Sequence, residues 1–377
     1  MIYLDNAATT APYNNPTLFW GNASSLYALG SYSRLALNDC KNTLSQIFKC
    51  DKEGIVFTSG ATEANNWVLR NIINKKILEC KDIKPHVIIS PIEHPSVMNV
   101  VKYYVEQGLI NLSYLIVDEK GHVLPQELIH LINDNTCLVS CMYANNEIGS
   151  IQPIEKIGDI CEQHGIMFHV DATQAVGKID IDVIHNNIDY LTFSGHKFHG
   201  PKGIGALICS SNILLNSLGP FMFGGHQQNG YRAGTENVDD IVSMTSVLNN
   251  RIQMHGYDEI KKKTKEINLY IENKLRQTFN DDEYIINSYD YEMPVFNVSF
   301  KNISGEYIVE ELNKKEIYIS TGSACTSGDL SPSYVLQAIK CPEEYIQGTI
   351  RISFDFLNNT MDDIDILFDE LKTIIKN

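Results

Sequence analysis

An acidic residue and a lysine, each following a short apolar run, are the pair of side chains in this 377-residue chain best suited to chemistry. Asp171 follows the apolar residues 166–170, and Lys197 comes shortly after the apolar residues 190–193. Runs of this length and composition are typical of strands. In open α/β sheets, ligands bind where strands end and their loops begin. We therefore predict that Asp171 and Lys197 converge on one bound ligand.

A lysine amine and a carboxylate at one site are the combination that pyridoxal 5′-phosphate requires. The lysine would form a Schiff base with the cofactor's aldehyde, and the acid would keep the ring nitrogen protonated so that the ring accepts electrons. Residues 59–63 could hold the cofactor's phosphate. Gly60 allows close backbone approach, and the amides of Ala61 and Thr62, with the Thr62 hydroxyl, would lie at a helix N-terminus. Taken alone, this segment is more simply interpreted as an ordinary helix cap.

Further phosphate contacts are predicted from two other places in the chain. Ser194 and His196 lie beside Lys197 and could both reach a phosphate held there. The glycine-rich residues 224–236 contain Thr235 and could close over a phosphate, in this subunit or a neighbouring one.

Three polar side chains that follow apolar runs could contact the cofactor ring. His94 comes after the run 86–90, and we predict that it stacks on the ring and shuttles protons, although a lone histidine is more often structural. Asn146 and Gln174 also follow apolar runs, and either could bond to the ring hydroxyl.

Arg351 and Cys325 are the candidates for handling a substrate. Arg351 is a charge inside the apolar run 349–354, and its planar fork fits a substrate α-carboxylate, with a structural ion pair as the alternative. Cys325 lies among the small and polar residues 320–332, where we expect an exposed, available thiol. An incidental loop cysteine is an equally good interpretation from the sequence.

The composition indicates a globular protein that works in the cytoplasm. Its formal net charge of −16 argues against nucleic acid or an anionic membrane surface as the main partner. No run approaches the ~20 apolar residues of a membrane span. The N-terminus lacks a basic region followed by an apolar one, so we expect no signal peptide. Nine cysteines without Cys-x-x-Cys spacing are interpreted as reduced thiols, and no metal site is expected.

The order of apolar patterns predicts an α/β fold with a mostly parallel sheet covered by helices on both faces. The expected strands of this sheet are residues 55–57, 86–90, 112–117, 137–142, 166–170, 190–193 and 206–209. The expected helices around it are residues 30–48, one that begins near 63 and passes 73, and residues 97–107, 125–133 and 154–164.

From about residue 241 the pattern changes to that of a smaller α+β lobe. A long helix is expected over 241–279, and Gly256 could break it. It precedes strands at 295–300, 317–320 and 349–354 and helices at 305–314 and 361–376. We predict a large cofactor-binding domain over 14–250. The small domain would comprise 1–13 and 251–377 and would carry the loop with Cys325.

Together, these residues and their order resemble a known family, the cysteine desulfurases, which are pyridoxal-phosphate enzymes of the class V aminotransferase group. The match runs in order along nearly the whole chain. It comprises 3–10 (YLDNAATT), 57–66 (FTSGATEANN), 93–94 (EH), 145–149 (NNEIG), 169–174 (HVDATQ), 194–203 (SGHKFHGPKG), 232–237 (RAGTEN), 322–327 (GSACTS) and 350–353 (IRIS). The chain differs from the usual pattern in three of these regions. The segment between Asp5 and Gly21 is shorter, residues 21–27 read GNASSLY where GNPSSLH is usual, and residues 354–356 read FDF where a glycine is expected.

The resemblance implies a homodimer of fold type I with the active site at the subunit interface. It implies these roles: Lys197 as Schiff-base lysine, Asp171 on the pyridine nitrogen, His94 stacked on the ring, Asn146 and Gln174 near its oxygen, Ala61, Thr62, Ser194 and His196 on the phosphate, Thr235 reaching the phosphate from the partner subunit, Arg351 on the substrate carboxylate, and Cys325 as nucleophile. Residues around Cys325 resemble the class with a long, mobile catalytic loop.

The implied reaction converts L-cysteine to L-alanine and leaves the sulfur as a persulfide on Cys325. An acceptor protein, in iron–sulfur cluster assembly or a thiolation pathway, would then take the sulfur. Related lyases acting on selenocysteine or cysteine sulfinate, and aminotransferases, are the alternatives within this chemistry. A non-catalytic scaffold is the alternative outside it. Cys325 distinguishes a desulfurase from an aminotransferase, because aminotransfer needs no thiol at that position.

Overall fold

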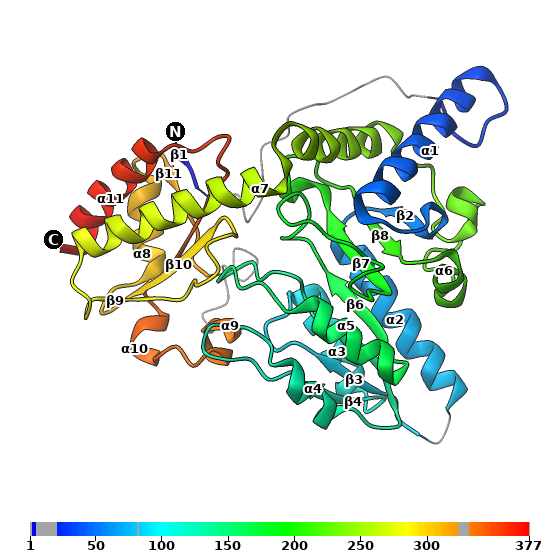
Figure 1. The fold of residues 1–377 in the computed structure, drawn as a ribbon, viewed down its shortest axis with the longest axis horizontal. Coiled ribbons are helices and arrows are strands. Elements are labelled where there is room, and N and C mark those ends of the chain that lie inside the picture. The colour runs from blue at the N-terminus through cyan, green and yellow to red at the C-terminus, as the bar shows by residue number, and fades with distance from the viewer. Residues whose placement is uncertain (1, 5–20, 81–82, 323–331, 377) are drawn as a thin grey trace.

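The computed structural model describes residues 2–4, 21–80, 83–322 and 332–376 (Figure 1). The described chain forms a large part built on a seven-stranded sheet and a small part that holds both ends of the chain. Cys325 and residues 5–20 lie outside the described residues, so the predictions that rest on them are not addressed by the coordinates.

The large sheet is mostly parallel, as predicted. Its strand order is β2-β8-β7-β6-β5-β3-β4, and β8 is antiparallel to both of its neighbours while the other pairs are parallel. The strands are β2 (Ile55–Thr58), β3 (His86–Ile89), β4 (Asn111–Tyr114), β5 (Thr136–Ser140), β6 (Met167–Asp171), β7 (Tyr190–Ser194) and β8 (Gly205–Cys209). The central strands are buried along their whole length, which explains their nearly continuous apolar sequences.

Helices cover both faces of this sheet, which confirms the α/β fold class. On one face α1 (Ala28–Phe48) and α5 (Ile154–His164) contribute Leu44 and Ile157 to a core cluster. On the other face α2 (Ala61–Glu79) contributes Trp67 and α3 (Pro95–Glu106) contributes Val101 to a second cluster. Helix α6 (Asn212–Leu218) also packs into this cluster. The short α4 (Pro125–Leu131) lies beside α5.

The small part is an antiparallel sheet with helices packed on it. Its strand order is β12-β10-β9, comprising β12 (Thr349–Ser353), β10 (Val295–Phe300) and β9 (Tyr284–Ile286). The N-terminal strand β1 (Ile2–Tyr3) pairs in parallel with β11 (Ile317–Tyr318), which places the start of the chain in this part. Its helices are α8 (Gly305–Asn313), α9 (Tyr334–Ala338), α10 (Glu343–Ile346) and α11 (Met361–Lys376).

Helix α7 (Val238–Thr278) joins the two parts (Figure 1). Its first half packs against α1 and its second half against α11. The predicted break at Gly256 is confirmed, because this residue has φ 65° and ψ 158° inside an otherwise helical stretch. A positive φ of this kind is readily adopted only by glycine. The division at residue 250 stays a prediction.

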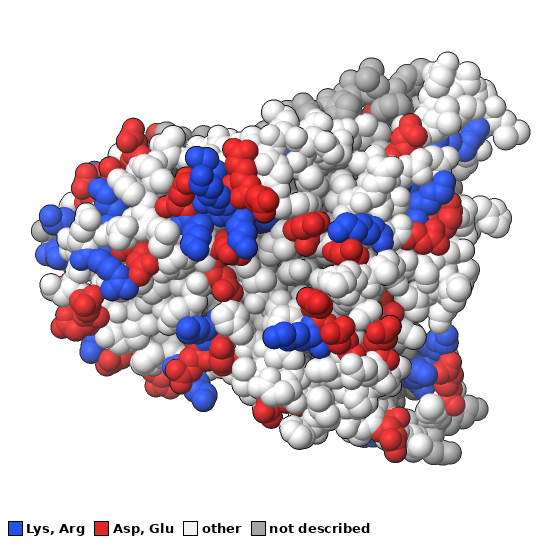
Figure 2. Space-filling model, viewed as in Figure 1, with Lys and Arg blue, Asp and Glu red and all other residues white. Residues whose placement is uncertain are grey.

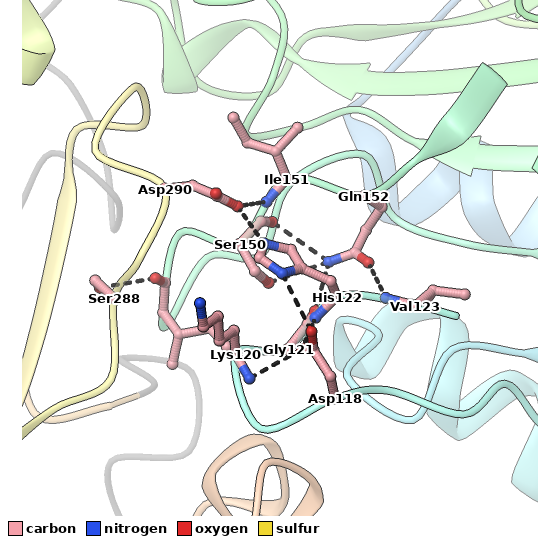
Figure 3. A network of polar contacts seen from close by, with 11 residues as sticks. Asp118, Lys120, Gly121, His122, Val123, Ser150, Ile151, Gln152, Ser288 and Asp290 are labelled. Atoms are coloured by element: carbon pink, nitrogen blue, oxygen red, sulfur yellow. Dashed lines mark hydrogen bonds and ion pairs between the residues drawn. The ribbon is translucent and has the colours of Figure 1, made fainter. Parts of the chain in front are cut away.

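A polar network also connects the two parts (Figure 3). Asp290, which lies between β9 and β10, accepts a hydrogen bond from the Ile151 amide at 2.6 Å and lies 2.7 Å from His122 Nε2. Nearby, the Ser288 hydroxyl donates to the carbonyl of Ile148 at 2.7 Å. The loop that carries Asn146 is therefore fixed against the small part.

The sequence patterns missed α6, α9, α10 and β9, all of which are short. The strand predicted over 112–117 ends at Tyr114, because β4 is an edge strand with partly exposed side chains rather than a buried run. The strand predicted over 317–320 ends at Tyr318, although Ser320 still exchanges backbone hydrogen bonds with Arg351.

Surface charge is mixed on the face shown in Figure 2. Lys and Arg side chains there lie among Asp and Glu side chains. Ion pairs at the protein surface include Lys261–Glu292 and Lys263–Glu266. Within the described part of the chain, no helix is both long and apolar enough to cross a membrane.

Candidate active site

One edge of the large sheet gathers most of the predicted site residues. Strands β3, β5, β6 and β7 run in parallel, so the segments that follow them leave the sheet at the same edge. These segments carry His94, Asn146, Asp171 and Lys197, with Asp171 as the last residue of β6 and Lys197 in the turn after β7. Strand β2 has the same direction, because both it and β7 are antiparallel to β8.

Asp171 is held in a fixed orientation at this edge. Its carboxylate is 3% exposed, and Oδ1 accepts a hydrogen bond from the Thr173 amide at 3.0 Å. Oδ2 accepts a hydrogen bond from Asn65 Nδ2 at 2.7 Å. These two hydrogen bonds fix the position of the carboxylate, as is required of an acid that pairs with a ring nitrogen.

Asn65, on α2, links this acid to His94. Its amide nitrogen also donates to Ser96 Oγ at 2.8 Å, and that hydroxyl lies 2.8 Å from His94 Nδ1. Its oxygen lies 3.1 Å from His169 Nε2. Burial lowers the pKa of His169 to about 4, so this imidazole is neutral beneath the acid.

His94 caps helix α3 through its side chain. Nδ1 accepts a hydrogen bond from the Ser96 amide at 3.1 Å, so the neutral imidazole carries its proton on Nε2. Burial lowers the pKa of His94, and the charge of Lys197 lowers it further while Asp171 opposes both. His94 is linked to Asp171 through Ser96 and Asn65.

A pocket of about 450 Å³ lies beside the start of α2. It is lined by Ser59, Gly60, Thr62, Glu63, Ser194, His196, Lys202 and Gly203. Ser194 Oγ accepts a hydrogen bond from the Ala61 amide at 2.7 Å, which joins the two predicted phosphate-binding segments. Burial and the neighbouring lysine charges lower the pKa of His196 to about 4. Hydroxyls, a lysine and the N-terminus of a long helix are donors that fit a phosphate.

Thr235 does not line this pocket and is exposed. Its glycine-rich segment is nevertheless attached to the pocket, because Arg232 binds the Glu63 carboxylate through Nε at 2.8 Å and Nη2 at 3.1 Å. Gln174 is buried in the turn that follows Asp171. The assignment of Thr235 to a partner's phosphate site stays a prediction.

Arg351 lies between the Asn146 loop and the segment that carries Cys325. It is 1% exposed, and Nη1 donates to the carbonyls of Asn146 at 3.0 Å and Gly322 at 2.9 Å. Gly322 is the last described residue before Cys325, so the predicted substrate-binding arginine contacts the start of that segment.

Glu147 contacts the other side of the same segment, and the sequence analysis gave it no role. Its Oε2 accepts a hydrogen bond from the Ser333 hydroxyl at 2.6 Å. A side-chain carbon placed on Gly322 would lie 3.0 Å from that oxygen. Burial raises the pKa of Glu147, while Ser333 and the charge of Arg351 lower it.

The sequence analysis also gave no role to two buried polar residues near the site, Asn65 and Glu93. Glu93 is fully buried and accepts the Met142 amide at 2.6 Å; burial, with the charge of Asp171, raises its pKa well above the ordinary value. Both residues, like Glu147, lie inside motifs that carried the resemblance. Their neighbours along the chain gave no signal of contacts that form across the fold.

The fold and this sheet edge agree with the family model for class-V aminotransferases, which matches residues 2–367. The chain belongs to that family. Over its whole length it is 37% identical to the cysteine desulfurase IscS of Methanosarcina thermophila and spans 92% of that protein. Curated relatives of this kind confirm the resemblance to cysteine desulfurases.

Solved structures give the same result. The chain is similar to a NifS-like protein with a TM-score of 0.88 and 30% identity, over 100% of this chain and 99% of that one. It is also similar to SspA in complex with cysteine, with a TM-score of 0.79 and 30% identity, over 94% of this chain and 99% of that one.

Proposed function

We propose that this chain is a pyridoxal-phosphate-dependent cysteine desulfurase that converts L-cysteine to L-alanine and transfers the sulfur through Cys325. The observation that carries the proposal is that Asp171 ends β6 and Lys197 lies in the turn after the adjacent parallel strand β7, with a pocket at the start of α2 lined by Ser194 and His196. The relatives named as cysteine desulfurases, and the similar protein solved with cysteine, support the substrate.

When bound, the cofactor would supply an electron sink for negative charge at the substrate α-carbon. Thr62, Ser194 and His196 would hold its phosphate, whereas the Ala61 amide, also predicted for this role, donates to Ser194 Oγ. Asp171 would hold a proton on its ring nitrogen, and the hydrogen bonds from Asn65 and Thr173 keep the carboxylate in position. His94 would lie against the ring, and Asn146 and Gln174 would contact its oxygen.

Lys197 would hold the cofactor, and its free amine would take the substrate's α-proton as a general base. Arg351 binds the substrate carboxylate with its planar fork. Its Nη1 contacts with two backbone carbonyls fix the guanidinium beside the Asn146 loop.

Sulfur transfer needs the thiolate of Cys325 rather than the thiol. The thiolate attacks the substrate Sγ, forming an S–S bond. The C–S bond breaks and leaves its electron pair on the substrate carbon, which takes up a proton and becomes the methyl group of alanine. The sulfur then passes from the Cys325 persulfide to an acceptor.

The acceptor is proposed to be a protein of iron–sulfur cluster assembly or of a thiolation pathway. A homodimer is proposed because Thr235 is exposed on a segment attached to the phosphate pocket, where it can face a second subunit. A cytoplasmic location is proposed because the eight cysteines within the described residues are all free thiols.

The test is product formation from L-cysteine with added cofactor and a reductant. Wild type should release alanine and sulfide in equal amounts, and Lys197→Ala and Cys325→Ala should each abolish both. Alanine production that survives in Cys325→Ala would assign the chain to a lyase that does not use a persulfide. Absence of both bound cofactor and activity in the wild type would contradict the proposal altogether.

A further inference from the structure

Four buried charged or titratable side chains lie around the turn that carries Lys197, and the proposed reaction uses none of them. They are Lys178, His199, Arg251 and Asp355, each 9% exposed or less. They come from four separate places: the turn after β6, the segment after Lys197, helix α7, and the segment after β12. Charged groups are rarely this buried unless they are paired.

Asp355 is the only carboxylate among the four, and both of its oxygens have polar contacts. Its Oδ2 lies 2.8 Å from Arg251 Nη2 and 3.1 Å from His199 Nε2. Its Oδ1 accepts a hydrogen bond from the Leu357 amide at 3.0 Å. Burial acts to raise the pKa of Asp355, but the His199 bond and the Arg251 charge outweigh it and lower the pKa well below its ordinary value.

The contacts form a closed ring that passes through Lys197. From Asp355, one branch leads through His199 along the backbone to Lys197, whose carbonyl accepts a hydrogen bond from Lys178 Nζ at 3.0 Å. The other branch leads through Arg251, whose Nε donates to the carbonyl of Gly177 at 2.9 Å. Gly177 is the neighbour of Lys178, so the two branches meet.

The backbone at His199 also shows that this ring constrains the lysine's turn. His199 has φ 71°, in the left-handed region that non-glycine residues rarely adopt. Such a conformation persists where the surroundings hold it in place. Here a fully buried imidazole is held by Asp355, two positions beyond Lys197.

Asp355 lies four residues after Arg351 on the chain that leaves β12. We infer that Asp355 is a positioning residue for Lys197: its carboxylate ties the turn that carries the lysine to the strand that carries the substrate-binding arginine. The inference rests on the proposed role of Lys197.

The test compares Asp355→Asn with Asp365→Asn in cofactor-loaded protein. Asp365 is the control, because it is also a small-part carboxylate with polar partners, Lys274 Nζ at 2.6 Å and the Tyr270 hydroxyl at 2.6 Å, and it does not belong to the ring. The readouts are the pH midpoint of the visible absorbance of the bound cofactor and the fraction of cofactor that borohydride fixes covalently to Lys197, measured by mass spectrometry. Neither readout depends on turnover.

Asp355→Asn removes a negative charge and leaves Arg251 and Lys178 uncompensated beside the lysine. The protonated form of the lysine–cofactor linkage should become less stable, so the midpoint should fall by about half a pH unit or more. The fraction fixed to Lys197 should fall as well, and Asp365→Asn should leave both readouts unchanged. No shift in Asp355→Asn, or equal shifts in the two variants, would overturn the inference.

If Asp355→Asn does not fold, Lys178→Met decides the question. This change removes the hydrogen bond to the Lys197 carbonyl and strands no carboxylate. If borohydride fixes a smaller fraction of the cofactor to Lys197 in Lys178→Met, the ring of contacts positions the lysine as inferred. An unchanged fraction overturns the inference. A wild type without visible absorbance would instead be a failure of the proposed function, which keeps the two failures distinguishable.

Discussion

Asn65 donates a hydrogen bond to Asp171 Oδ2 at 2.7 Å and so connects helix α2 to the acid at the end of β6. The same amide group contacts Ser96 and His169, which makes Asn65 the centre of a buried polar network. The acid's orientation therefore depends on a residue of a different element, helix α2.

We predict that Asn65→Leu, which keeps the volume and removes the amide, weakens the function of Asp171. A hydrogen bond to a charged group contributes about 1.5–3 kcal/mol, so turnover should fall by roughly 10- to 100-fold. The visible spectrum of the bound cofactor should change with it. Asn71→Leu is a control, since Asn71 lies on the same helix and bonds to backbone carbonyls near Gly219. A normal spectrum in Asn65→Leu would contradict the role given to Asn65.

Ser194→Ala is expected to weaken cofactor binding. The change removes the hydroxyl that accepts the Ala61 amide and lines the phosphate pocket. Loss of one hydrogen bond of about 0.5–1.5 kcal/mol corresponds to roughly 2- to 13-fold weaker affinity. Ser211→Ala is the matched control, because Ser211 caps helix α6 in the same way without facing the pocket. Equal affinity in the two variants would show that Ser194 is only a helix cap.

Glu147→Ala should impair sulfur transfer and spare cofactor binding. The carboxylate contacts Ser333 and approaches Gly322, which are described residues on either side of Cys325 in the sequence. Its loss removes a charge-assisted hydrogen bond worth about 1.5–3 kcal/mol. Sulfide release should therefore fall by roughly tenfold or more, while the visible absorbance stays at its wild-type level. Glu147→Gln, which can still accept the Ser333 hydroxyl, should lose less activity. A loss of absorbance in Glu147→Ala would place the defect at the cofactor instead.

The contact between His122 and Asp290 should make stability depend on pH (Figure 3). The hydrogen bond to Asp290, with the charge of Asp118, raises the pKa of His122 in the folded protein. A raised pKa means that the charged pair stabilises the fold fully below the unfolded value of about 6.5. This contribution is lost as the pH rises through the higher folded pKa.

Urea unfolding from pH 6 to pH 9 measures this effect. The free energy of unfolding of the wild type should decrease over the window above about pH 6.5, and His122→Gln should remove that decrease. If the two proteins showed parallel pH profiles, His122 would not be the group responsible.

The sheet and the residues at its edge were predictable because strand and loop patterns are local. Residues 166–170 and 190–193 are apolar and end at a polar side chain, and parallel strands bring such ends together. The phosphate pocket was predictable for the same reason, since Gly60 and Thr62 start a helix.

The ring behind Lys197 was not predictable from such patterns. Lys178, Arg251 and Asp355 are far apart in the sequence, and each resembles a solvated charge when viewed with its neighbours alone. Their burial depends on how α7 and the segment after β12 pack against the large sheet. Thr235 is the opposite case, because its predicted role depends on a second subunit.

The most direct test of the central claim is to find where the sulfur goes in one turnover. The protein, loaded with cofactor, is mixed with one equivalent of L-cysteine without reductant, and alanine is measured while the peptide that contains Cys325 is examined by mass spectrometry. The account predicts one added sulfur on Cys325 for each alanine formed. Alanine formed without added sulfur on that peptide would contradict it.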